Sequence, residues 1–179
     1  MVPGAPARAP RRVGRLEPLG DALFQELQWV HRMIRRDLGT VRDLATATAN
    51  GDASPSEVRE GIDALKTDGP LWKLRINCLR YCRFVHSHHN AEDAMLFPAL
   101  RAANPELGPV VDRLEADHRR VSDLLDAVED SAGALAEKAG GEQRQAVAAA
   151  LDDLADDLLE HLEFEEENVA ETMTSMTAL

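Results

Sequence analysis

The sequence predicts an all-α protein: an up-down-up-down four-helix bundle with a short extra helix between the first two long helices. Apolar residues recur every three or four positions in four long segments, as in helices that bury one face. Aromatic residues make up only 4% of the chain, and alanine and leucine are abundant, which favours helix. Glycine, proline and asparagine separate the four segments, and these residues end helices.

The first long helix is expected from about residue 21 to residue 49, because Asn50-Gly51 tolerates the left-handed backbone of a helix C-terminus. A short helix should follow near 55–67. The preceding stretch SPSE at 54–57 has the pattern of a capping box with proline in the first turn.

The second long helix is expected over about 71–103, with Pro98 inside it. Proline lacks an N–H group and clashes with the preceding turn, so a kink or an early end is expected after Phe97. The third long helix should cover about 105–136, opened by Asn104 as its N-cap and a proline in the first turn.

The fourth long helix is expected near 142–172, after the break at Gly140-Gly141. Residues 1–16 contain three prolines, four arginines and no acid, and they lack the apolar run of a secretory signal. We therefore expect a disordered basic arm there. The bundle is expected to occupy residues 17–175 as a single domain, a size that can bury a real core.

Charge and composition exclude several classes of function. The formal net charge of −12 argues against a nucleic-acid partner, which would require clustered basic residues. No stretch approaches the roughly 18 apolar residues of a membrane span. Two cysteines four positions apart indicate reduced thiols rather than a disulfide framework, and so a cytoplasmic protein. The sequence gives no indication of a protein partner.

Each of the four apolar stripes is interrupted by one histidine, and in two cases a glutamate follows four residues later on the same face. In an up-down-up-down bundle, the four histidines all fall roughly 15–23 Å from one end, at about 1.5 Å per residue. Burying these imidazoles and carboxylates without a cation would cost several kcal/mol per unpaired charge. The predicted metal ligands are His31, His88, Glu92, His118, His161 and Glu165.

The ligand types indicate which metal is bound. Structural zinc sites prefer four ligands and often use thiolates. Six nitrogen and oxygen ligands, with two carboxylates able to bridge, suit a pair of iron or manganese ions. We favour two iron ions over manganese or zinc.

The residues around these histidines resemble the hemerythrin-like HHE cation-binding domain. The resemblance rests on a histidine in the first helix, HHNAEDAMLFP at 88–98, Asp117-His118 and HLEFEE at 161–166, and it covers about residues 20–170. It implies a four-helix bundle around an oxo- or hydroxo-bridged di-iron centre that is open to a small ligand, held by the same six residues.

One ligand of the oxygen-carrying hemerythrins is missing. They show His-x-x-x-His on the third helix, whereas Ser122 stands four residues after His118. The site should then have a second open position or recruit a replacement. Tyr81 is a candidate because phenolate binds iron(III) well. The favoured reading of Tyr81 is nevertheless a core tyrosine with a hydrogen-bonded hydroxyl.

Other polar residues near the motif are further candidates. His86 and His89 lie about 160° and 100° around the helix from His88, so we expect them to face a neighbouring helix or solvent. His89 is the alternative to His88, since it shares a face with the same glutamate. Glu166 is the alternative to the glutamate before it. Three acids are candidate hydrogen-bond acceptors for ligand N–H groups: Asp93, Asp117 and Glu26.

Two classes of function are consistent with these residues. The first is a binding protein or sensor for dioxygen, nitric oxide or peroxide, and we favour it. The alternative is a di-iron enzyme that decomposes peroxide or reduces nitric oxide, because two open positions let a substrate reach both ions. The missing imidazole at Ser122 favours the second class. The expected partner is in either case a small diatomic or peroxide ligand, and whether the protein is an enzyme stays open.

Overall fold

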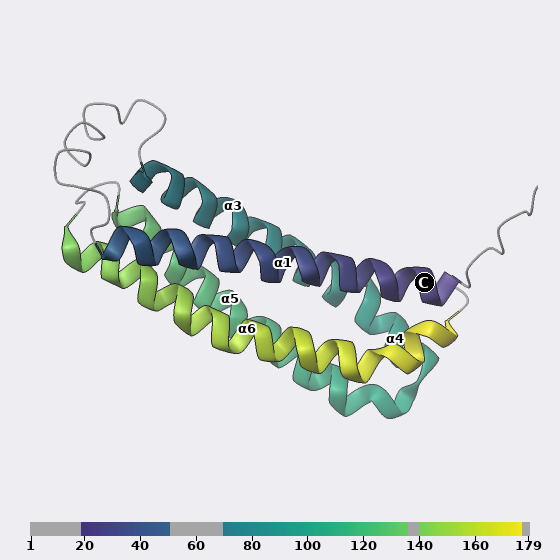
Figure 1. The fold of residues 1–179 in the computed structure, drawn as a ribbon. Helices are drawn as coiled ribbons and strands as arrows, with labels where there is room; N and C mark the ends of the chain where they lie inside the picture. The colour runs from purple at the N-terminus through teal and green to yellow at the C-terminus, as the bar shows by residue number, and fades with distance from the viewer. Residues whose placement is uncertain (1–18, 51–69, 136–139, 177–179) are drawn as a thin grey trace, which may run out of the picture.

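Four long helical segments make up the protein in the computed structural model, which describes residues 19–50, 70–135 and 140–176 (Figure 1). These ranges contain no strand, and none of their helices is both long and apolar enough to cross a membrane. The elements are α1 (Leu19–Ala49), α3 (Pro70–Ala91), the π-helix η1 (Glu92–Leu96), α4 (Phe97–Ala103), the 3-10 turn η2 (Pro105–Leu107), α5 (Gly108–Ala134) and α6 (Gly141–Ser175).

The helices pack side by side as a bundle in which α1 contacts α3 and α6, and α5 contacts the same two helices. The start of α1, the end of α6 and α4 all lie at one end of the bundle (Figure 1). Gly20 permits close contact there, because a Cβ atom at this position would collide with the carbonyl oxygen of Met173. The predicted four-helix bundle is confirmed. The predicted short helix near 55–67 and the arm at 1–16 lie outside the described residues.

The predicted helix ends agree with the structure to within a few residues. Asn104 accepts a hydrogen bond from the backbone N–H of Glu106 at 3.1 Å, as expected of a residue that caps a helix. The turn that it opens is the 3-10 turn η2, and α5 itself begins only at Gly108.

The expected interruption of the second long segment lies earlier than predicted. It is the π-helix η1, in which the N–H of Phe97 bonds to the carbonyl oxygen of Glu92, five residues back. A π-turn inserts one extra residue, so the residues after it are rotated relative to a regular α-helix. Met95, which the α-helical stripe places inward, is 64% exposed, and Leu96 is buried instead. The apolar stripe of a regular α-helix therefore predicts the wrong orientation for Met95.

The apolar core consists of two clusters of buried residues. One contains Ile34, Val85 and Val121, and the other contains Leu27 and Leu114. His31 lies between Leu27 of one cluster and Ile34 of the other, and His118 lies between Leu114 and Val121 in the same way. The buried polar groups therefore form a layer between two apolar layers.

Candidate metal centre

A first group of polar side chains lies where α1 faces α3. The Nε2 atom of His31 is 3.1 Å from Nε2 of His88, which is 3.2 Å from Oε1 of Glu92. The same oxygen is 3.9 Å from Nε2 of His31. The three residues each offer one nitrogen or oxygen atom, all within 4.8 Å of one another. Ligands about 2.0–2.2 Å from one ion have this kind of mutual separation.

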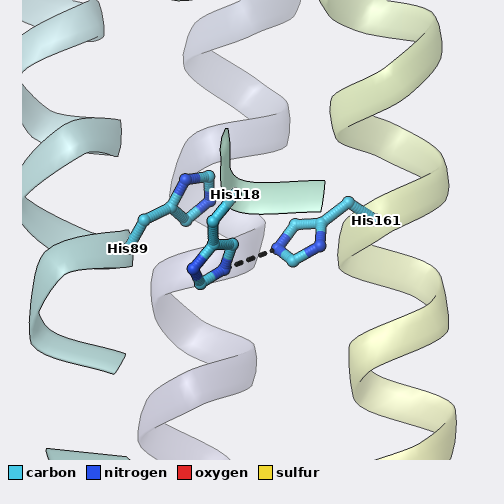
Figure 2. Close-up of side chains that lie close together, drawn as sticks. All are labelled: His89, His118 and His161. Carbon is cyan, nitrogen blue, oxygen red and sulfur yellow. Dashed lines mark hydrogen bonds between the residues drawn. The ribbon is translucent and has the colours of Figure 1, made fainter. Parts of the chain in front are cut away.

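A second group consists of histidines from α3, α5 and α6 (Figure 2). The Nε2 atoms of His118 and His161 are 3.1 Å apart. The ring of His89 stacks on that of His118, with centroids 4.0 Å apart and planes 10° from parallel. One ring nitrogen from each of the three histidines lies within 4.8 Å of the others.

Two glutamates lie between the groups. Glu92 belongs to the first group through Oε1, and its Oε2 is 3.7 Å from Nε2 of His118 in the second. Oε2 of Glu165 is 3.4 Å from Nε2 of His31 and 3.9 Å from Nε2 of His161. Each carboxylate therefore approaches an imidazole of both groups, which is the arrangement expected of a bridging carboxylate.

The carboxylate oxygens of these glutamates lack hydrogen bonds. Glu92 is 4% exposed and Glu165 is 0% exposed, and none of their four oxygens has a hydrogen-bond partner among the described residues. Buried carboxylate oxygens without hydrogen-bond partners are costly. The donors are imidazole nitrogens and carboxylate oxygens, a set that suits iron or manganese. The residues present therefore fit a pair of cations.

The outer nitrogens of two histidines contact carboxylates that hold the rings in place. Nδ1 of His31 is 2.8 Å from Oε1 of Glu166, which also accepts a hydrogen bond from Arg35 at 2.7 Å. Nδ1 of His118 is 2.8 Å from Oδ1 of Asp93. When Nδ1 carries the proton and donates a hydrogen bond to the carboxylate, Nε2 is unprotonated and free to bind a metal.

The family model of the hemerythrin HHE cation-binding domain matches residues 22–172. The chain belongs to this family. The match covers nearly the whole chain, and together with the histidine and glutamate groups it indicates a metal-binding protein. No curated protein and no solved structure matches the chain.

The six predicted ligands of this hemerythrin HHE domain meet in the structure. The three candidate hydrogen-bond acceptors for ligand N–H groups lie at different distances from the histidines. Asp93 bonds His118, whereas Oδ2 of Asp117 lies 4.0 Å from Nδ1 of His161, too far for a hydrogen bond. Glu26 is exposed on α1. Glu166, the alternative to Glu165, contacts the outer nitrogen of His31, whereas Glu165 lies between the two groups.

Tyr81 is not part of this layer. It is two helical turns from His88, about 10 Å along the helix, and it lines a separate pocket with Asp37 and Asn77. Its hydroxyl is buried and has no hydrogen-bond partner among the described residues, and burial raises its pKa. The expectation of a core tyrosine is confirmed, but the expected hydrogen bond is not found.

The two histidines that flank His88 have different surroundings. Nε2 of His86 is 3.6 Å from Oδ1 of Asp126 on α5, so this ring faces a neighbouring helix near the surface, as expected. His89 is 5% exposed and belongs to the second group, so treating it as an alternative to His88 was wrong. A rotation of about 100° between consecutive residues lets one ring face α1 and the next face α5.

Burial and nearby carboxylates set the charges of these groups. Burial lowers the pKa of His88 to about 3, that of His118 to about 2 and that of His161 to about 4, so these rings are neutral, as metal binding requires. Burial opposes a charge on His31, but the nearby carboxylates of Glu165, Glu166 and Glu92 outweigh it and raise the pKa of His31 to about 10. Burial, together with repulsion by a second carboxylate, raises the pKa of Glu92.

The metal-free protein should lose stability as the pH falls from 6.5 to about 5. The pKa values of His88, His89, His118 and His161 lie below the 6.5 of an ordinary histidine, so in this range the unfolded chain binds protons that the native state does not bind. Glu92 and His31, whose pKa values are raised, oppose this change, but with fewer protons than the four histidines contribute. We expect a lower midpoint of urea unfolding at pH 5 than at pH 6.5, and an equal or higher midpoint would contradict these assignments.

A pocket of about 390 Å³ lies beside the second group and is lined by residues of α3, η1 and α5. Its lining includes the buried rings of His89 and His118, the half-buried Ser122, and the charged side chains of Glu115 and Arg119. A small molecule can therefore approach the second group from solvent.

Proposed function

We propose that this hemerythrin HHE domain binds two iron ions between its four helices and uses them to bind or sense dioxygen, nitric oxide or peroxide. His31 and His88 would bind one ion, and His118 and His161 the other. Glu92 and Glu165 would bridge the pair. The observation that carries this proposal is that four buried carboxylate oxygens lie between two groups of imidazoles and have no hydrogen-bond partner in the described part of the chain.

The donor set supports iron over zinc. Structural zinc sites often use thiolates, and both cysteines of this chain, Cys78 and Cys82, are free thiols in the larger apolar cluster. Burial raises the pKa of each to about 12, so both stay protonated. Bound iron would supply the one-electron and dioxygen chemistry that amino-acid side chains lack.

The pocket beside the second group supports a small ligand. It leads to His118 and His89, while apolar layers close the site above and below. The protein residues would restrict access by size, since a ligand has to pass between α3 and α5. Dioxygen, nitric oxide and peroxide are small enough to do so.

The alternative is a di-iron enzyme that decomposes peroxide or reduces nitric oxide. It is favoured by Ser122, which provides no imidazole one turn after His118 and lines the same pocket. A position left open there would let a substrate reach both ions.

Addition of hydrogen peroxide to the iron-loaded protein separates the two functions. If the protein is a binding protein or sensor, the visible absorption spectrum should change on mixing, while an oxygen electrode records no more gas than an equal amount of free iron releases. Sustained oxygen release that requires the folded protein would support the enzyme. A spectrum that responds to neither peroxide nor nitric oxide nor dioxygen would contradict the small-ligand proposal, and metal-free protein serves as the blank.

The cytoplasmic location and the absence of nucleic-acid and membrane partners stay predictions from the sequence. The net charge of −12 supports the absence of a nucleic-acid partner, because phosphate backbones attract basic surfaces. No protein partner is proposed.

A further inference from the structure

His89 is a buried histidine whose inner nitrogen has no partner. The residue is 5% exposed, and its Nε2 atom makes no hydrogen bond with any described residue. Its ring stacks on His118 at 4.0 Å and meets the ring of His161 edge-on at 5.1 Å (Figure 2). Packing alone explains a buried ring but not a buried nitrogen without a hydrogen bond.

The two groups have the same number of donor residues only when His89 is counted in the second. The first group has two imidazoles and a carboxylate from His31, His88 and Glu92. Without His89, the second group has only the imidazoles of His118 and His161 as its own donors. With it, the second group also has three donors within 4.8 Å of one another.

We propose that His89 is a ligand of the second metal ion through Nε2, together with His118 and His161. The proposal rests on the two-ion site described above and adds a seventh residue to it. Two consecutive residues of α3 would then serve different ions, His88 the first and His89 the second. The half-buried Ser122 lines the same pocket as His89 and His118 and follows His118 by one turn. A histidine at position 122 should therefore reach the same ion from α5.

Metal content of purified variants tests this role directly. His89→Phe keeps a flat ring against His118 but removes the nitrogen, so we expect bound iron to fall from about two ions per chain to about one. His89→Ala should give the same loss, which keeps the test valid if the phenylalanine does not fit. The double variant His89→Ala/Ser122→His should bind the second ion again, and Ser122→His alone should keep both.

The outcomes separate this inference from the function on which it rests. If wild type binds two ions and the folded His89→Phe and His89→Ala variants also bind two, His89 is a packing residue and the inference is wrong, although the site stands. If the double variant His89→Ala/Ser122→His does not bind the second ion again, a histidine at position 122 of α5 does not reach this ion. If folded wild type binds no ion, the proposed function fails as well. Circular dichroism of each variant shows whether the bundle has formed.

Discussion

Addition of iron(II) to the metal-free protein is expected to raise the midpoint of thermal unfolding by about 10 °C. A ligand present at a thousand times its dissociation constant stabilises the native state by about 4 kcal/mol. For a chain of this length, each kcal/mol moves the midpoint by about 2–4 °C. The physical reason is that the four buried oxygens of Glu92 and Glu165 have no hydrogen-bond partner among residues 19–50, 70–135 and 140–176, so a cation would supply the missing interactions. Differential scanning calorimetry under anaerobic conditions measures the shift.

Magnesium at the same concentration is the control. It prefers oxygen ligands and retains much of its water, so a site rich in imidazole should bind it poorly. We expect a much smaller shift with magnesium, and the shift caused by iron should disappear when a chelator is added. Equal shifts for the two metals would indicate binding to the acidic surface instead of the buried layer.

His88→Ala should weaken iron binding by about 100-fold or more. Loss of an outer hydrogen-bond partner costs 10–100-fold in metal affinity, so loss of a direct ligand should cost at least as much. Nε2 of His88 lies 3.1 Å from His31 and 3.2 Å from Glu92, and no other described imidazole belongs to this group. Competition with a coloured chelator gives the affinity.

His86→Ala is the matched control, two residues earlier on the same helix. This ring lies near the surface beside Asp126 and belongs to neither group of candidate ligands among the described residues. We expect the affinity for iron and the number of bound ions to stay as in wild type. Equal losses in both variants would mean that the helix, and not the imidazole of His88, determines binding.

The fold and the meeting of the histidines could be predicted because both follow from helical periodicity. His31, for example, stands between Leu27 and Ile34 on one stripe, so a helix that buries these apolar residues also buries the imidazole. The common height follows from residue counts at a fixed rise per residue. The separations of 3.1 Å between His31 and His88 and between His118 and His161 agree with that layer.

The position of His89 could not be predicted in the same way. Helical spacing gives its angle from His88 but not where α5 packs, and the contact with His118 depends on that packing. The π-helix is a second example. No residue in 92–96 prevents a regular helix, so Pro98 indicates an interruption nearby but not the extra residue that exposes Met95 and buries Leu96.

The most direct test of the metal centre is the number of metal ions bound per folded chain. Metal-free protein is titrated anaerobically with iron(II), passed over a desalting column and analysed by inductively coupled plasma mass spectrometry. We expect about two ions per chain, as for other bundles that hold a di-iron centre with histidines and carboxylates. A well-folded protein that retains no metal would contradict the central claim.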